Sequence, residues 1–151
     1  MKEQFTTNVI NLKSYSISEA DKIILMYSKE KGLIKGVAKG IKKTSSKLGG
    51  RMDLLVANKM MLNKGRNLDT ICQAEALNTF FNLRNDINKL FYAMYCCEIV
   101  TNFGSENDPN SEEIYNLFYT FLEQIALAKT KEQVMLCVLR FQLKIMNITG
   151  Y

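Results

Sequence analysis

The sequence predicts an α+β protein in which five β-strands come first and about three α-helices follow. Two observations support this prediction. Before about Thr79, short β-prone runs alternate with turn residues, and after it apolar residues recur every three or four positions. A length of 151 residues fits one domain or two small ones. We therefore expect a β-rich domain over residues 1–78 and an α-helical domain over residues 79–151.

Five runs have the composition of β-strands. β-Branched, aromatic and aliphatic residues dominate them, and glycine-containing turns such as Lys31-Gly32 separate them. The predicted strands are residues 5–12, 22–28, 33–39, 53–62 and 70–76. Five strands are too few for a self-standing sandwich of about seven. They suit a small barrel, and the five-stranded OB-fold, a nucleic-acid-binding architecture, is the leading candidate.

The first long helix is predicted over residues 86–103, with Gly104 placed to end it. Its apolar residues recur three and four positions apart, and we expect four of them to face the core: Ile87, Leu90, Phe91 and Met94. Glu98 falls on the same stripe. A buried carboxylate needs a partner, so we expect Arg84 or Arg140 to pair with Glu98 in a structural role.

Asn110 or Ser111 is predicted to begin the second helix, because two glutamates follow and suit the positive end of a helix dipole. Its predicted buried face comprises Ile114, Leu117, Phe118, Phe121, Leu122 and Ile125. The third helix begins at Thr130, forms a capping box with Gln133 and runs to about residue 147. Apolar residues nearly encircle it, so we expect a partner protein or further chain to cover it.

Composition disfavours an enzyme. The chain has no histidine, which removes Ser-His, Cys-His and His-metal arrangements, and it has no P-loop or GxGxxG motif. Its four cysteines show no metal-site or disulfide spacing, so we expect reduced thiols and predict neither a metal nor another cofactor: Cys72, Cys96, Cys97 and Cys137. No run is long enough to span a bilayer and no signal peptide is present, which predicts a cytoplasmic protein without a membrane partner.

A basic block between Lys35 and Arg66 is the strongest functional signal. It contains nine Lys/Arg and a single acid, for a net charge of +8, whereas the rest of the chain is net −3. Such one-sided charge, threaded with Gly and Ser, is typical of a surface that meets nucleic acid. The predicted DNA-binding residues are Lys35, Lys39, Lys42, Lys43, Lys47, Arg51, Lys64 and Arg66.

The expected contacts are to the nucleic-acid backbone. Lysine binds phosphate as a point charge with little sequence preference, and arginine can add bidentate phosphate contacts. Aromatic residues for base stacking are few in the predicted barrel: Phe5, Tyr15 and Tyr27, of which Phe5 and Tyr27 are expected in the core. We therefore predict binding dominated by phosphates and steeply dependent on salt.

Several segments, in this order, resemble the RecO family of bacterial recombination-mediator and DNA-repair proteins. They are residues 18–21 (SEAD), 30–40 (EKGLIKGVAKG) with the lysines that follow, and 64–75 (KGRNLDTICQAE). Leu83 and Arg84, then Tyr92, Tyr95 and Glu98, resemble the family's first long helix. Phe141, Leu143 and the terminal Gly150-Tyr151 resemble the end of its third.

The resemblance implies an OB-fold followed by a helical domain. It also implies binding of single- and double-stranded DNA, strand annealing, partnership with RecR and contact with the tail of single-strand-binding protein. Family members generally continue beyond the point matching Gly150-Tyr151, and many carry a four-cysteine zinc loop there, which this sequence lacks. The site for the single-strand-binding protein tail depends on that later part.

Three other functions compete with a non-catalytic DNA-binding mediator. A protein-interaction adaptor would use the apolar third helix, and the basic block would then only aid solubility. An RNA-binding OB protein would use the same cations on a different polymer. A nuclease or ligase is the weakest alternative, because the sequence has no recognisable metal or nucleotide site.

Overall fold

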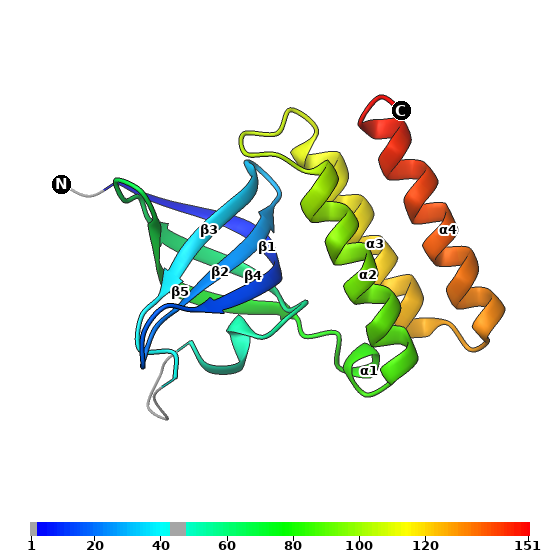
Figure 1. Ribbon diagram of the computed structural model, residues 1–151, viewed down its shortest axis with the longest axis horizontal. Helices are drawn as coiled ribbons and strands as arrows, with labels where there is room; N and C mark the ends of the chain where they lie inside the picture. Colours follow the sequence, from blue (N-terminus) through cyan, green and yellow to red (C-terminus); the bar gives the residue numbers. More distant parts are fainter. Residues whose placement is uncertain (1–2, 43–47) are drawn as a thin grey trace.

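The computed structural model describes residues 3–42 and 48–151 (Figure 1). Within these residues, a barrel of five strands precedes four α-helices, and the helices lie beside one side of the barrel. The strands are β1 (Gln4–Ser16), β2 (Lys22–Ser28), β3 (Gly32–Ala38), β4 (Ala57–Asn63) and β5 (Asp69–Asn78). The helices are the 3-10 helix η1 (Gly49–Met52) and α1 (Phe81–Arg84), α2 (Ile87–Phe103), α3 (Ser111–Leu127) and α4 (Lys131–Ile148).

The barrel closes in the order β1-β2-β3-β5-β4, which confirms the predicted five-stranded OB-fold. The long strand β1 closes it by pairing with two neighbours. Residues 4–10 of β1 pair with β4, and residues from Val9 to Ser16 pair with β2, across a bulge between Asn11 and Lys13. All neighbours are antiparallel except β3 and β5, which pair in parallel through Gly36 and Val37.

Two strand boundaries differ from the prediction by four residues, whereas those of β3 and β5 shift by only one or two. β1 continues to Ser16, because its second half pairs with β2. The predicted strand at residues 53–62 begins only at Ala57. Leu55 has a φ of 67°, which an extended strand cannot accommodate, and its side chain is fully buried. Local β propensity predicted a strand here, but burial of Leu55 in the core selects a turn.

The three long helices lie where the periodicity predicted them. Asp86 caps α2, since its side chain accepts hydrogen bonds from the backbone N–H groups of Asn88 and Lys89. The Thr130 side chain accepts from the Gln133 N–H at 3.1 Å, as expected for the predicted capping box. The predicted buried face of α3 is confirmed as well, with Leu117 only half-buried. The one-turn helix α1 was not predicted.

The predicted buried face of α2 is wrong. Ile87, Phe91 and Met94 are exposed, and Leu90 is only partly buried. The buried residues are instead Ala93, Cys96, Cys97 and Val100. Apolar residues lie on most sides of this helix, so periodicity alone could not decide which side meets the core.

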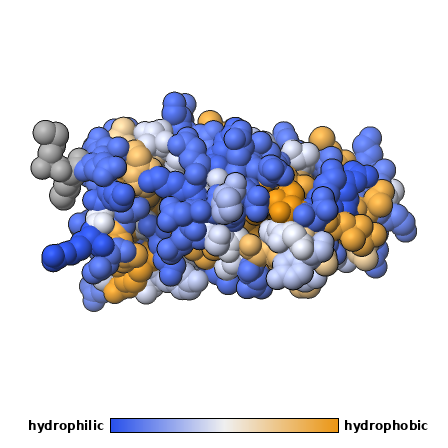
Figure 2. All heavy atoms as spheres, turned by 90° about the horizontal axis from the view of Figure 1, so that it is seen from above, coloured by the Kyte–Doolittle hydropathy of each residue, from blue (hydrophilic) through white to orange (hydrophobic). Residues whose placement is uncertain are grey.

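Helix α4 exposes a second apolar face. Val134, Val138, Phe141 and Ile145 are buried against the other helices. The opposite side is at least two-fifths exposed at Met135, Leu136, Leu139, Leu143 and Met146. Figure 2 shows apolar surface interrupting the hydrophilic surface at the helical end of the molecule. The prediction that α4 is apolar on nearly all sides is confirmed, and within the described residues its outer side is left uncovered.

The barrel and the helices are joined by a buried polar contact, which we call the Tyr27–Asp108 joint. The Tyr27 hydroxyl donates to Asp108 Oδ2 at 3.0 Å, and the same carboxylate accepts from the backbone N–H groups of Ser105 and Asn110. Gly32 lies against this loop with a φ of 79°, and a Cβ there would stand 2.4 Å from the Ser105 carbonyl oxygen. Only glycine both adopts this positive φ without strain and leaves room for the Ser105 carbonyl oxygen.

One hydrophobic core runs across the junction. It contains Leu12, Leu25 and Tyr27 from the barrel together with residues of all four α-helices. A second, smaller core fills the barrel interior around Val9, Met26 and Met60. The division into domains at residues 78 and 79 stays a proposal. The shared core predicts that the two parts unfold together.

Stability should fall at alkaline pH because two buried thiols resist ionisation. Burial raises the pKa of Cys96 to about 12, and burial also raises that of Cys97, from an ordinary value of 9.0. Below pH 9 the two thiols stay protonated in both the folded and the unfolded protein. Above pH 9 they lose their protons only in the unfolded protein. The free energy of unfolding should therefore drop by about 3 kcal/mol between pH 8 and pH 10.

Urea denaturation at several pH values measures this effect. A Cys96→Ala, Cys97→Ala double variant serves as the comparison, because it lacks both thiols and should show a flatter dependence in the same range. Equal slopes in the two proteins would contradict the assignment.

Candidate nucleic-acid interface

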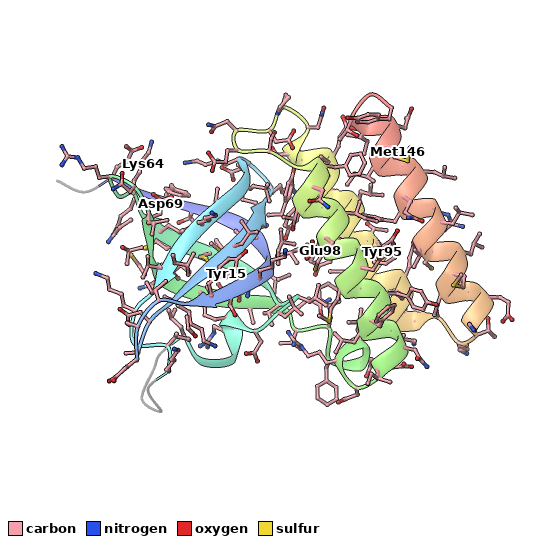
Figure 3. The ribbon with its side chains drawn as sticks, in the orientation of Figure 1. Tyr15, Lys64, Asp69, Tyr95, Glu98 and Met146 are labelled. Carbon is pink, nitrogen blue, oxygen red and sulfur yellow. The ribbon has the colours of Figure 1, made fainter. Side chains whose placement is uncertain are left out.

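Three lysines surround a shallow pocket at one end of the barrel, and we call them the turn-end cluster. Lys31, Lys35 and Lys64 line a pocket of about 300 Å³ together with Asp69 and Glu106. Lys35 is exposed on β3, and Lys64 begins the turn between β4 and β5. Figure 3 shows Lys64 and Asp69 at the end of the barrel far from the helices. These lysines therefore come together from two segments of the chain, the hairpin of β2 and β3 and the turn between β4 and β5.

The turn that carries Lys64 has a defined shape. The Asp69 carboxylate accepts a hydrogen bond from the Gly65 N–H at 3.1 Å, which closes the turn. The Lys64 backbone N–H donates to the Glu3 carbonyl at 2.8 Å. Arg66 is exposed within the same turn. Its backbone position is thus fixed, while its side chain remains accessible to a ligand.

Lys39 and Lys42 lie beyond the opposite end of β3, and together with Arg51 we call them the loop-end group. The Gly40 N–H donates to Asp21 at 2.8 Å, and the Lys42 ammonium donates to the Ser18 carbonyl at 2.8 Å. These bonds hold the start of the loop against the turn between β1 and β2. Lys39 and Lys42 are both exposed there.

Two buried asparagines anchor the segment that carries Arg51. Asn11 and Asn58 both donate from Nδ2 to the Arg51 carbonyl oxygen, at 2.8 and 2.7 Å. Asn11 also donates to the Asp53 carbonyl at 2.9 Å. Both amides come from barrel strands, so they hold η1 against the barrel and leave the Arg51 side chain exposed.

The predicted site thus divides in two. Lys35 on β3 and Lys39 directly after it are both exposed, and a spacing of four residues in an extended chain places them about 13 Å apart. The turn-end cluster lies at one end of this strand and the loop-end group at the other. Lys43 and Lys47 lie outside the described residues. Sequence reasoning missed Lys31, which it interpreted only as part of a turn, although its neighbour Gly32 begins β3.

The burial of the barrel's aromatic residues agrees with the prediction. Tyr27 is fully buried, and Phe5 is partly buried in the barrel core with the Lys31 ammonium 3.6 Å from its ring centroid. Tyr15 is 47% exposed near the end of β1. It is therefore the one barrel aromatic of the three that offers its side chain extensively to solvent.

Glu98 pairs with a cation, as predicted, but the partner is neither Arg84 nor Arg140, and the carboxylate lies at the surface. Its side chain is 53% exposed and pairs with Lys13 at 2.7 Å. The hydrogen bond to Glu98 raises the pKa of Lys13. Arg84 instead donates to the carbonyl oxygens of Thr79 and Leu54. The error follows from the misassigned face of α2, which turns Glu98 towards β1 at the surface.

Comparisons with known proteins agree with this architecture. A family model described as Recombination protein O N terminal matches residues 1–80, which include the whole barrel. A second, described as Recombination protein O C terminal, matches residues 84–151. The chain belongs to the RecO family. The family resemblance predicted from the sequence is confirmed.

Curated relatives named DNA repair protein RecO are 31–39% identical to this chain over the aligned residues. One from Acaryochloris marina is 37% identical over 150 residues, which cover 99% of this chain and 50% of the relative. Another from Nostoc punctiforme is 39% identical over 125 residues, covering 83% and 41%. A third from Dehalococcoides mccartyi is 31% identical over 147 residues, covering 97% and 56%. The chain thus spans about half the length of these RecO relatives.

None of the described helices is long and apolar enough to cross a membrane.

Proposed function

We propose that this protein is a non-catalytic DNA-binding protein of recombinational repair. It binds single- and double-stranded DNA through the phosphate backbone, promotes annealing of complementary strands and assists recombinase loading. RecR and single-strand-binding protein are the protein partners that membership of the RecO family suggests. One observation carries the DNA-binding part of this proposal. Exposed cations lie on β3 and beyond both of its ends: Lys35 on the strand, Lys39 and Lys42 after it, and Lys64 in the turn between β4 and β5.

The chemistry of these cations supports backbone binding. Lysine and arginine gain affinity by displacing the counterions condensed on DNA, and this gain does not depend on base sequence. Charge that is neutralised along two strands at once also lowers their mutual repulsion, which favours annealing. Within the described residues the barrel supplies six of the proposed contacts: Lys35, Lys39, Lys42, Arg51, Lys64 and Arg66.

Salt titration tests the proposal directly. Six phosphate contacts predict a slope of about −4 for log affinity against log salt on single-stranded DNA, because each contact contributes roughly 0.7. Fluorescence anisotropy with a labelled dT oligonucleotide, a duplex and an RNA of equal length would measure it between about 50 and 200 mM salt. A slope near zero would contradict backbone binding, and a clear preference for RNA would favour the RNA-binding alternative.

The exposed face of α4 favours a second candidate function, a protein-interaction adaptor. Five large apolar side chains on one helix leave an uncovered surface of the kind that binds other proteins. An adaptor would bind a partner protein through α4 and would show no affinity for any of the three nucleic acids. A Leu139→Lys, Leu143→Lys variant should then lose partner binding while retaining its thermal stability.

A further inference from the structure

A pocket lies where the barrel meets α2, apart from the turn-end cluster. It has a volume of about 310 Å³. β1 contributes Tyr15 and Leu12 to its lining, η1 contributes Met52, and α2 contributes Met94. Figure 3 shows Tyr15 on the barrel and Glu98 on the neighbouring helix α2. The pocket is therefore built from three elements that the fold brings together.

Among the described residues that line this pocket, the only charged ones are Lys13 and Glu98, which form an ion pair at 2.7 Å, so this part of the lining is nearly neutral. A phosphate would meet the Glu98 carboxylate here, which disfavours the DNA backbone. The aromatic ring of Tyr15 and the thioethers of Met52 and Met94 instead suit a flat, polarisable and uncharged group.

The strand at the wall of the pocket also has an open edge. The pairing of β4 with β1 ends at Ile10, whereas the pairing of β2 with β1 continues to Ser16. Residues 13–16 of β1 therefore pair with β2 along one edge. Their other edge has no paired strand, and Lys13, Ser14 and Tyr15 line the pocket. Backbone N–H and C=O groups on an open edge can form hydrogen bonds with an added ligand.

We infer that this pocket binds a single unpaired nucleobase, which stacks on Tyr15 and is enclosed by Met52 and Met94. The inference rests on the proposed DNA binding and adds a base contact to it. Arg51 precedes Met52 in η1, and Lys42 is bonded to Ser18, three residues after Tyr15. Cations of the loop-end group thus lie close in the chain to residues that line the pocket. A DNA strand whose phosphates contact these cations can turn one base into the pocket.

A base fits this pocket better than a peptide strand does. Addition of a peptide strand needs several residues of exposed edge, whereas the open edge here covers four residues between η1 and α2. A base needs one flat apolar space and a few hydrogen-bonding groups at its rim. Duplex DNA cannot use the pocket without unpairing, so the site would distinguish single strands from duplexes.

Replacement of Tyr15 tests the inference. Tyr15→Ala should weaken binding of a dT oligonucleotide by between about 5-fold and 150-fold, the range for loss of one stacked base. Tyr15→Phe should bind like the unmodified protein because it keeps the ring. Tyr15→Ala should leave the salt slope, the duplex affinity and the affinity for an abasic oligonucleotide unchanged. Tyr95→Ala is the matched control, since Tyr95 is equally exposed, at 46%, but lies outside the pocket.

Photo-crosslinking gives a second measurement that does not depend on the folding of a variant. A dT oligonucleotide with one 5-iodouracil, irradiated with the unmodified protein, should crosslink to the peptide that contains Tyr15. Crosslinks confined to other peptides, or equal affinity of the Tyr15→Ala variant for the dT oligonucleotide, would overturn the inference. Failure of the unmodified protein to bind any DNA would instead overturn the proposed function itself.

Discussion

Replacement of Asp108 by alanine is expected to lower the free energy of unfolding by about 3–5 kcal/mol. The Asp108 carboxylate accepts three hydrogen bonds, from the Tyr27 hydroxyl and from the backbone N–H groups of Ser105 and Asn110. Tyr27 is fully buried, so its hydroxyl would be left without a partner and without water. The melting temperature should fall by about 10 °C.

Two further variants make this prediction specific. Tyr27→Phe removes only one of the three bonds and should cost roughly 1 kcal/mol. Glu106→Ala changes an exposed acid in the same loop and should have little effect. Differential scanning calorimetry measures all three proteins. Equal melting temperatures for the Asp108→Ala and Glu106→Ala variants would show that the joint does not stabilise the fold.

The joint also bears on the candidate interface. The Asp108 backbone N–H donates to the Lys31 carbonyl, and the Leu33 N–H donates to the Ser105 carbonyl. These bonds hold the turn between β2 and β3, which carries Lys31 into the turn-end cluster. An Asp108→Ala variant that remains folded at low temperature should therefore bind DNA more weakly than its net charge alone predicts.

Removal of two lysines from the turn-end cluster is expected to weaken single-stranded DNA binding by roughly 25-fold at 0.1 M salt. A Lys35→Ala, Lys64→Ala variant loses two proposed phosphate contacts, so the log–log salt slope should become shallower by about 1.4. Since 0.1 M lies one decade below 1 M, a slope that is shallower by about 1.4 lowers the affinity at 0.1 M salt by a factor of roughly 25. Salt titration by fluorescence anisotropy gives both numbers in one experiment.

The matched control changes the same net charge elsewhere. A Lys129→Ala, Lys131→Ala variant removes two exposed lysines from the helical part, beside the start of α4. Its salt slope should stay within error of that of the unmodified protein. A similar loss in both variants would mean that affinity follows net charge rather than the placement of cations on the barrel. An unchanged slope in the Lys35, Lys64 variant would remove the turn-end cluster from the proposed interface.

Short-range patterns were sufficient to locate most elements of this fold. β2 was predicted at its observed boundaries, residues 22–28, because its β-prone run is bounded by clear turn residues. The start of α4 was found from the Thr130 cap, and that of α3 from the polar run before it. These signals act over three to eight residues. They do not depend on the rest of the chain, so a sequence alone contains them.

Faces and partners required the folded structure. The apolar residues of α2 do not select one side, and the choice of Cys96 and Val100 over Ile87 and Phe91 depends on how the barrel and the other helices pack against it. The same packing directed Glu98 to Lys13, a residue 85 positions away that no local pattern connects to it. Contacts between distant residues leave no periodic signal in either segment.

The basic block illustrates the same difference between what local sequence determines and what tertiary packing determines. Its composition and its position around the third strand could be seen in the sequence, and both indicated a surface for a polyanion. Its separation into a turn-end cluster and a loop-end group, the addition of Lys31, and the neutral pocket beside Tyr15 arise only when the barrel closes. Charge is a property of each residue and is fixed by the sequence. The distances between charges are set by long-range strand pairing and helix packing.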